Sequence, residues 1–196
     1  GLEPALIKSG VVLFDTLIRY ELGTLPLFLL MAHLCFSANA SRDLFDAAAR
    51  WLGHRRGGLA LSSIGGCAAF GAINGSSLAT AATIGMVALP EMRRRGYSDA
   101  LATGAVAAGG TLGQMIPPSG ALIVFGIVAE QSIGRLFTAA IVPGLTQMLG
   151  YFITIWILVR LRPQIAPQTE RASWAERWAA LGRIVEIGAP DVRIGV

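Results

Sequence analysis

Two stretches of small and polar residues, each inside a long apolar segment, carry the groups best suited to chemistry. The first is the run Asn74-Gly75-Ser76-Ser77, and the second is GGTLGQMIPPSG at residues 109–120. A helix that breaks in apolar surroundings leaves free N–H groups at one new end and free carbonyls at the other. The N–H end suits a carboxylate, whereas carbonyls and hydroxyls suit a hard cation such as Na⁺. The residue types therefore indicate binding of an anion, of Na⁺, or of both.

The candidate ligands offer either a side-chain oxygen or a backbone that can approach a bound ion. Glycine permits such an approach, and Pro117-Pro118 removes two backbone donors and pushes Ile116 out of helical geometry. Neither break contains an acidic residue, which argues against a divalent-metal site built on carboxylates and against a carboxylate proton relay. The candidate binding residues are Asn74, Gly75, Ser76, Ser77, Gly110, Thr111, Gly113, Ile116, Pro117, Pro118 and Ser119.

Simpler interpretations of both breaks stay open. The spacings Gly71-x-x-x-Gly75 and Gly109-x-x-x-Gly113 also suit close packing of membrane helices. The Asn-Gly-Ser-Ser run can be a loop outside the membrane between two spans of about 17 residues, near the lower limit for spanning. The proline pair can likewise be an ordinary loop. An enzyme is not expected, because no Ser–His or His–Asp constellation offers a nucleophile and base, and His33 and His54 lie far apart in the sequence.

The composition favours a lipid bilayer as the surroundings of these breaks. Hydrophobic residues make up 54% of the 196 residues and charged residues only 14%, whereas soluble domains carry about 25% charged residues. The net charge of +4 could favour nucleic acid. However, the arginines fall at the ends of apolar segments and are not interleaved with aromatic residues, so no nucleic-acid partner is expected.

Clusters of basic residues indicate the orientation. His54-Arg55-Arg56 precede the first interrupted segment, Arg93-Arg94-Arg95 follow it, and Arg160 and Arg162 follow the last apolar span. Cytoplasmic loops carry an excess of Lys and Arg, so all three clusters are expected to face the cytoplasm. The first interrupted segment then returns to its own side, and the second crosses once. The second interrupted segment is about 34 residues long, whereas a straight span needs about 20. The helix that makes this crossing must therefore be broken.

The sequence thus predicts an all-α polytopic membrane protein whose single membrane domain, residues 1–196, is incomplete. The two interrupted segments show no convincing direct repeat. The predicted segments are an amphipathic arm (1–21), a span (22–38), an interfacial helix (42–54), a re-entrant helical hairpin (57–92), a broken transmembrane helix (98–131), a span (136–159) and a polar tail (163–196).

One continuous stretch, GAINGSSLATAATIGMVALPEMRRRGYSDALATGAVAAGGTLGQMIPPSGALIVFG, resembles the large membrane subunit of tripartite ATP-independent periplasmic (TRAP) transporters, the DctM-like family. The resemblance runs from about Gly23 to Pro163 and on into residues 171–180. It implies one half of an inverted-repeat, elevator-type transporter in the bacterial inner membrane. It also implies Na⁺-driven uptake of an organic acid such as a C4-dicarboxylate. The implied partners are a periplasmic substrate-binding protein and a small TRAP membrane subunit, with no cofactor besides the coupling ion.

The resemblance also implies which residues hold the ion. The first hairpin tip of the family maps onto Asn74 to Ser77, and the interrupted helix that shares its ion site maps onto Gly113 to Pro118. The implied Na⁺ ligands are Asn74, Ser76 and Ser77 with backbone carbonyls near Gly113, Ile116 and Pro118. The family protein has two inverted halves, and the sequence carries features of the first. A truncated, non-transporting membrane fragment and half of another ion-coupled anion symporter therefore stay open as alternatives.

Overall fold

The computed structural model describes residues 7–11, 14, 20–37, 40–167, 177, 178 and 180, and in this part of the chain every element is a helix. The predicted arm and polar tail lie largely outside the described residues. The all-α prediction is confirmed for the rest, while the membrane placement of the predicted segments stays a prediction. The helices are α2 (Tyr20–Ser37), α3 (Ala40–Leu52), α4 (Gly58–Asn74), α5 (Ser77–Arg94), α6 (Asp99–Met115), α7 (Gly120–Val128), α8 (Ile133–Leu161) and the short 3₁₀ helix η1 (Pro163–Ile165).

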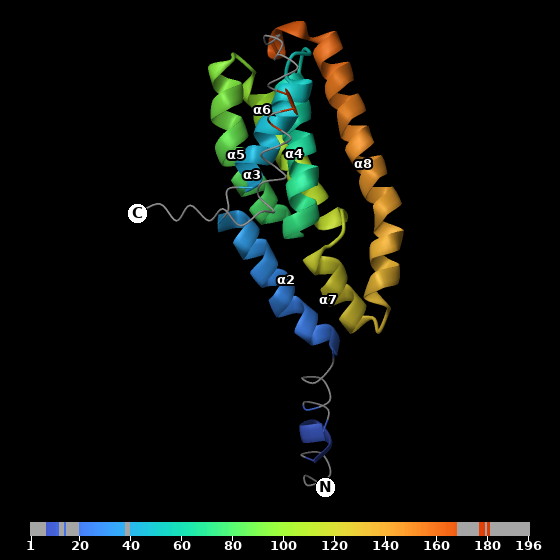
Figure 1. Cartoon of the computed structure of the whole chain (residues 1–196). Coiled ribbons are helices and arrows are strands. Elements are labelled where there is room, and N and C mark those ends of the chain that lie inside the picture. The colour runs from blue at the N-terminus through green and yellow to red at the C-terminus, as the bar shows by residue number, and fades with distance from the viewer. Residues whose placement is uncertain are drawn as a thin grey trace, which may run out of the picture.

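The helices run roughly along one long axis (Figure 1), and α4, α5 and α6 pack on one another. Helix α4 turns back into α5 at Gly75-Ser76, and α6 then returns beside both. Helix α7 continues beyond α6, and α8 runs back along the length of the bundle. Helix α3 packs on α4, while α2 contacts both α4 and α7. The two predicted breaks thus fall between neighbouring helices.

Glycines allow the three central helices to approach closely. A Cβ atom added to Gly71 of α4 would collide with the backbone of Gly113 in α6. A Cβ on Gly109 would lie 2.9 Å from the Cys67 sulfur, and one on Gly110 would lie 2.6 Å from the Ala81 side chain. The interpretation of these glycines as packing residues is therefore confirmed. It does not exclude a second role for those nearest the breaks.

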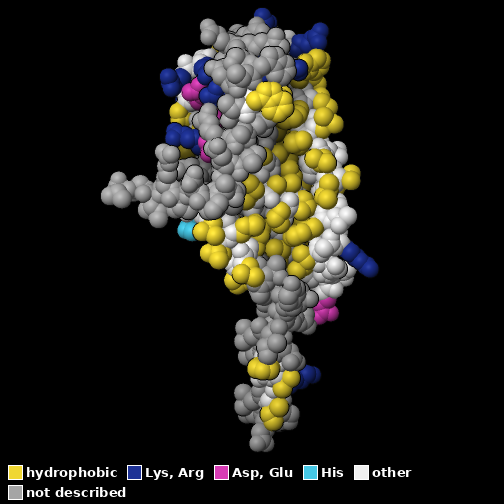
Figure 2. All heavy atoms as spheres, viewed as in Figure 1, with side chains coloured by type: hydrophobic (Ala, Val, Ile, Leu, Met, Phe, Trp, Pro, Cys, Tyr) yellow, Lys and Arg dark blue, Asp and Glu magenta, His cyan; other side chains and the backbone are white. Residues whose placement is uncertain are grey.

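The outward faces of several helices are apolar, as a bilayer requires. Among the described residues, α8 is the one helix that is long and apolar enough by itself to cross a membrane. Helices α6 and α7, bent by 42° at their break, qualify as a second span when taken together. The buried residues of α8 lie on one stripe, whereas hydrophobic side chains elsewhere on it are exposed and contribute to the apolar face in Figure 2.

The three basic clusters lie at the same end of the bundle, the upper end in Figures 1 and 2. The loops that carry them touch. The Leu59 N–H donates to the Tyr97 hydroxyl at 3.3 Å, and the Ser98 N–H donates to the Ile165 carbonyl at 3.0 Å. A Cβ on Gly57 would lie 2.7 Å from the Val159 side chain. This arrangement is the one that a common cytoplasmic side requires.

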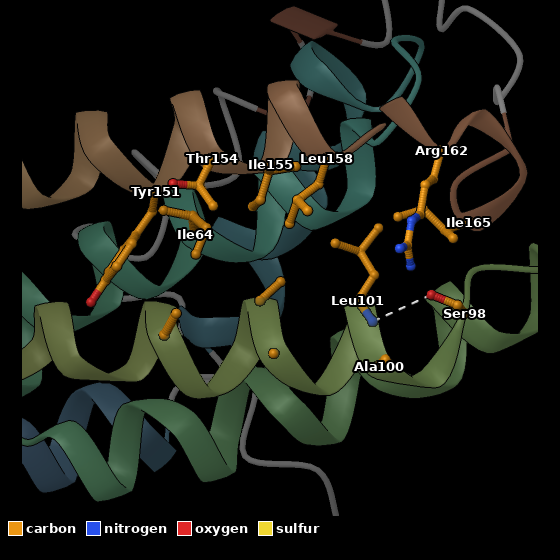
Figure 3. A pocket seen from close by; sticks show the side chains of 13 residues that line it. Ile64, Ser98, Ala100, Leu101, Tyr151, Thr154, Ile155, Leu158, Arg162 and Ile165 are labelled. Atoms are coloured by element: carbon orange, nitrogen blue, oxygen red, sulfur yellow. Dashed lines mark hydrogen bonds between the residues drawn. The ribbon is translucent and has the colours of Figure 1, made fainter. Parts of the chain in front are cut away.

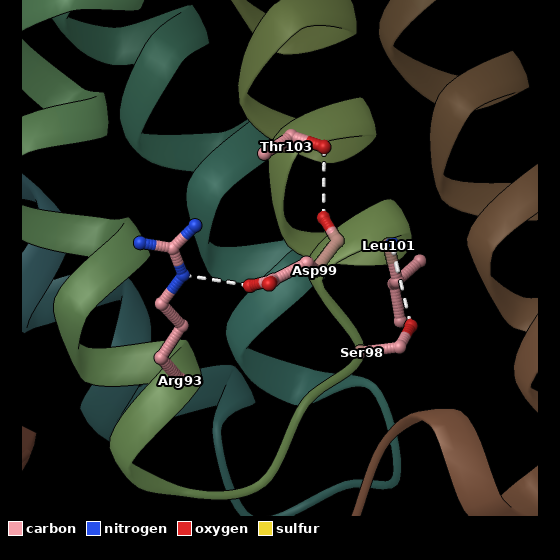
Figure 4. A network of polar contacts seen from close by, with 5 residues as sticks. All are labelled: Arg93, Ser98, Asp99, Leu101 and Thr103. Carbon is pink, nitrogen blue, oxygen red and sulfur yellow. Dashed lines mark hydrogen bonds and ion pairs between the residues drawn. The ribbon is translucent and has the colours of Figure 1, made fainter.

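Polar contacts fix the turn between α5 and α6 (Figure 4). The Arg93 Nε donates to the Asp99 carboxylate at 2.6 Å, which links the last turn of α5 to the first turn of α6. The Ser98 hydroxyl accepts the Leu101 N–H at 3.3 Å and caps α6. Because the ion pair is exposed to solvent, its contribution to stability is small. The N-cap contributes about 1 kcal/mol.

Candidate ion-binding site

The two breaks lie directly against each other. The Gly120 N–H at the start of α7 donates to the Gly75 carbonyl at 3.2 Å. A Cβ on Gly75 would lie 2.6 Å from the Pro118 carbonyl oxygen and would collide with the Phe28 ring of α2. Residues about 45 positions apart in the sequence are thus joined, and the Phe28 ring covers the junction.

The break between α4 and α5 depends on one glycine and one serine. Gly75 adopts left-handed geometry with φ of 63°, and its N–H donates to the Gly71 carbonyl to end α4. Glycine suits this conformation because it has no Cβ. Ser76 is extended, and its hydroxyl accepts the Ala79 N–H at 3.4 Å to cap α5. The chain therefore reverses direction at the Gly75-Ser76 pair.

The break between α6 and α7 depends on the proline pair. Helix α6 ends at Met115, and Ile116 is extended, with φ of −82° and ψ of 124°. This confirms that the prolines push Ile116 out of helical geometry. The peptide bond between Pro117 and Pro118 is cis. The buried Ser119 hydroxyl then accepts the Leu122 N–H at 3.4 Å and caps α7.

Four helix ends consequently meet in one region. Helices α4 and α6 end there, so their last carbonyls carry partial negative charge, and α5 and α7 begin there with partial positive charge. A Cβ on Gly113 would lie 2.9 Å from the Ser76 carbonyl oxygen, which shows how closely the two breaks approach. A site of this kind can hold a cation on the carbonyl side and an anion on the N–H side.

The predicted ligands separate into two groups. Eight are near the junction, namely Asn74, Gly75, Ser76, Gly113 and the four residues between α6 and α7, Ile116, Pro117, Pro118 and Ser119. The Asn74 side chain is buried and donates to the Ser76 carbonyl at 3.5 Å.

The second group makes other contacts. The Ser77 hydroxyl donates to the Gln114 side chain at 3.2 Å in an exposed position. The Thr111 hydroxyl lies 2.9 Å from the Tyr151 hydroxyl and accepts from Gln147 at 3.0 Å, so it faces α8. Gly110 packs on Ala81. The structure therefore does not bring these three predicted residues into direct contact with the junction.

Thr80 also lies in this region, although it is not among the predicted ligands. Its hydroxyl is fully buried and has no hydrogen-bond partner among the described residues. It lies 2.5 Å from the position that a Cβ on Gly113 would occupy. Its spacing of four residues from Ser76, the N-cap of α5, places it above the cap on the same side of the helix and is the one local signal of its position. A buried hydroxyl without a partner calls for an explanation, and a bound ion is one.

A cavity of about 400 Å³ opens beside the first break, between α2 and the start of α5. Phe28, His33, Asn74, Ser76 and Gly120 are among its lining residues. Its size is within the range of roughly 300–1,000 Å³ that is typical of small-molecule pockets. Among the described residues, no group of three or more His, Cys, Asp or Glu side chains could hold a metal ion. The junction residues Asn74, Gly75, Ser76, Gly113 and Pro118 are all uncharged, so the oxygens they offer are neutral.

A helical membrane protein in which two interrupted helices meet at their breaks has the architecture of a binding region in a secondary transporter. The comparison with known families gives the particular class. The profile of the family described as "Tripartite ATP-independent periplasmic transporter, DctM component" matches residues 8–190. The chain belongs to this family, and the resemblance stated from the sequence motifs is confirmed.

The names of individual relatives state different substrates. The chain is 39% identical over 182 residues to the C4-dicarboxylate TRAP transporter large permease protein DctM of Pseudomonas aeruginosa, covering 92% of this chain and 42% of the relative. It is 34% identical over 178 residues to the ectoine TRAP transporter large permease protein TeaC of Halomonas elongata, covering 89% and 41%. It is 34% identical over 184 residues to the isethionate TRAP transporter permease protein DctMQ of Oleidesulfovibrio alaskensis, covering 90% and 29%.

The chain thus spans less than half the length of these relatives. The prediction that it carries one half of the family protein agrees with this coverage.

Proposed function

We propose that this chain is the ion-binding half of a Na⁺-coupled membrane subunit that imports an organic acid, such as a C4-dicarboxylate, across the bacterial inner membrane. The observation that carries the proposal is the meeting of the two breaks, where the Gly120 N–H donates to the Gly75 carbonyl. Four helix ends at one place offer the carbonyls and N–H groups that ion-coupled transporters use. In this proposal residues 57–92 form a re-entrant hairpin, and the completed protein works as an elevator.

Neutral oxygens at the junction fit Na⁺. The proposed ligands are the side chains of Asn74 and Ser76 and the carbonyls near Gly113, Ile116 and Pro118, whereas the Ser77 hydroxyl, which donates to Gln114, is left out of the set. The buried Thr80 hydroxyl, which has no hydrogen-bond partner among the described residues, supports the proposal because desolvating such a group without compensation costs about 1–3 kcal/mol. Na⁺ would supply positive charge between the breaks, and the chain's role is to hold these oxygens at a fixed place.

The organic acid is proposed to lie on the N–H side of the same breaks. Helices α5 and α7 begin at Ser77 and Gly120, and the cavity of about 400 Å³ lies beside these starts. Helix N-termini favour carboxylates. The C4-dicarboxylate class rests on the relative from Pseudomonas aeruginosa, whose name carries that substrate. The proposed partners are a periplasmic substrate-binding protein and a small membrane subunit.

Uptake by the complete transporter tests this function. The complete permease that contains this sequence would be reconstituted in liposomes with its small subunit, and succinate uptake would be measured with and without the binding protein. We expect uptake to require both the binding protein and an inward Na⁺ gradient, and to disappear when K⁺ replaces Na⁺. Equal uptake without Na⁺ would contradict the proposal that Na⁺ is the coupling ion. Na⁺-driven uptake of ectoine but not of succinate would contradict the proposal that the substrate is a C4-dicarboxylate.

Succinate uptake by the 196-residue chain alone, reconstituted in the same way, tests whether this chain transports without the rest of the permease. We expect it to insert without transporting succinate, because a site between two halves needs both. Na⁺-driven uptake by the chain alone would show that the ion-binding half suffices and would contradict this expectation.

A further inference from the structure

A groove runs between α6 and α8 at the end of the bundle that carries the basic clusters (Figure 3). Its volume is about 390 Å³. Thr154, Ile155 and Leu158 approach it from α8, and Leu101 approaches from α6. This groove is separate from the two breaks, and the transport proposal makes no use of it.

The lining changes in character along the groove. Apolar side chains make up most of the walls, whereas Ser98 and Arg162 lie together at the end toward η1 (Figure 3). The Arg162 side chain is exposed, and it has no hydrogen-bond or ion-pair partner within the described part of the chain. No Asp or Glu is among the residues that line the groove. The groove therefore combines an apolar body with an unpaired positive charge at its mouth.

The start of α6 reinforces this positive charge. Helix α6 begins at Asp99, directly after Ser98, so its first N–H groups face the same end of the groove. The partial positive charge of a helix N-terminus favours an anion. Asp99 directly follows Ser98 in the sequence, but its carboxylate is paired with Arg93 of α5. An anion at this mouth would meet Arg162 without a competing carboxylate in the lining.

The length of the groove matches one leaflet of a bilayer. Its lining residues on the α8 side extend from Tyr151 to Arg162. At about 1.5 Å per helical residue, this stretch covers roughly 16 Å. The hydrocarbon core of a bilayer is about 30 Å thick, so one leaflet accounts for about 15 Å. An acyl chain would therefore fit along the groove while its head group reached Arg162.

We propose that this groove binds one anionic phospholipid of the cytoplasmic leaflet, with its phosphate at Arg162 and an acyl chain between α6 and α8. The charge at the mouth selects a head group with net negative charge, and the apolar walls select a lipid over a free anion. Basic pockets between membrane helices on the cytoplasmic side bind anionic head groups in the same manner. The lipid would fill the space between a central helix and the long outer helix.

Two variants separate the head-group contact from the chain contact. Arg162→Gln removes the charge, and its control is Arg160→Gln, because Arg160 lies over the Trp156 ring at 5.2 Å and does not line the groove. Gly104→Leu fills the groove, since a Cβ at Gly104 would meet no atom within 4 Å. Its control is Gly150→Leu, where a Cβ also meets no atom within 4 Å but lies outside the groove. Replacing a helical glycine with leucine favours the helix, so both leucine variants should fold.

Native mass spectrometry of the detergent-solubilised chain, titrated with phosphatidylglycerol or phosphatidylcholine of identical acyl chains, measures the binding. We expect a preference for phosphatidylglycerol of about fivefold, from one basic residue near the head group. Arg162→Gln should abolish the preference, Gly104→Leu should weaken both lipids, and both control variants should bind as the unchanged chain does. Circular dichroism of each variant checks that it is folded.

Three results would overturn the proposal. The first is a preference for phosphatidylglycerol that survives Arg162→Gln in a folded variant. The second is unchanged lipid binding in Gly104→Leu, which would place the lipid outside the groove. The third is displacement of phosphatidylglycerol by an equal concentration of inorganic phosphate, which would identify a site for free anions.

Discussion

Ser76 serves both the helix and the candidate ion site, and a matched pair of variants separates the two roles. Its hydroxyl caps α5 by accepting the Ala79 N–H at 3.4 Å, much as Ser98 caps α6 by accepting the Leu101 N–H at 3.3 Å. Ser76→Ala and Ser98→Ala should each cost about 1 kcal/mol of stability. Only Ser76→Ala should also raise the Na⁺ concentration for half-maximal uptake by the complete transporter. An equal rise in Ser98→Ala would show that the effect comes from stability.

At the scale of single residues, the sequence predicts the junction only in part. Asn74, Gly75 and Ser76 are recognisable because a polar run and a glycine inside an apolar segment have a local meaning. The buried Thr80 hydroxyl has only its spacing from Ser76 as a local signal, and the Phe28 ring over Gly75 has none, because both positions depend on how α2, α5 and α6 pack. The same tertiary packing turns Thr111 toward Tyr151.

At the scale of elements, the crossing of α4 and α6 controls how closely the breaks approach. Two glycines of α4 form a matched pair for testing it. A Cβ on Gly71 would collide with Gly113, whereas a Cβ on Gly65 would lie 4.0 Å from the Ala48 side chain. Gly71→Ala should destabilise the fold by about 1–3 kcal/mol through overpacking. Gly65→Ala should stabilise it by up to about 1 kcal/mol through helix propensity.

Thermal unfolding of the two variants in detergent, followed by circular dichroism, measures this difference. Similar midpoints for Gly71→Ala and Gly65→Ala would contradict the tight crossing.

Tyr97 links the start of α4 to the turn between α5 and α6, and ionisation of its buried phenol should destabilise the fold because the charge is desolvated. Burial raises the pKa of the Tyr97 phenol, although the Leu59 N–H and Arg95 partly oppose the shift. The folded chain thus keeps the proton at pH values where the unfolded chain has lost it. The resulting stabilisation is present below about pH 10, the unfolded value, and is lost as the pH rises through the folded pKa.

Tyr97→Phe tests this link by removing both the titration and the acceptor for the Leu59 N–H. The variant should lose about 1–3 kcal/mol at neutral pH, because a first-turn N–H of α4 is left without its partner. Unfolding midpoints measured between pH 8 and 11 should then fall less steeply than those of the unchanged chain. An identical alkaline loss in Tyr97→Phe would assign the effect to other groups.

The positions of the breaks were predictable from local residue types, whereas their meeting was implied only by the family resemblance. A glycine in left-handed geometry and a proline pair interrupt helices through local sterics, so the ends of α4 and α6 follow from the sequence. The bend of 42° between α6 and α7 and the hydrogen bond from Gly120 to Gly75 depend on contacts between distant segments. Periodicity and residue type carry no information on such contacts.

At the scale of the whole molecule, the basic loops give a prediction about orientation. All three lie at one end of the bundle, so they should face one compartment, the cytoplasm. Single cysteines replacing Arg56 and Arg95, in a background without Cys35 and Cys67, should react only with a reagent supplied from the cytoplasmic side. Labelling of Arg95→Cys from the periplasm would contradict the orientation and the re-entrant hairpin together.

The Na⁺ dependence of uptake in Asn74→Ala tests the central claim, that the meeting point of the two breaks is the coupling-ion site, most directly. Thr138→Ala is the control, because Thr138 lies in α8 and its hydroxyl donates only to its own helix, at the Gly134 carbonyl. Losing one buried ligand costs about 1–3 kcal/mol, or roughly 5- to 150-fold in affinity. In the complete, reconstituted transporter, Asn74→Ala should raise the half-maximal Na⁺ concentration by that factor and Thr138→Ala should leave it unchanged. An unchanged Na⁺ dependence in a normally inserted Asn74→Ala variant would contradict the ion site.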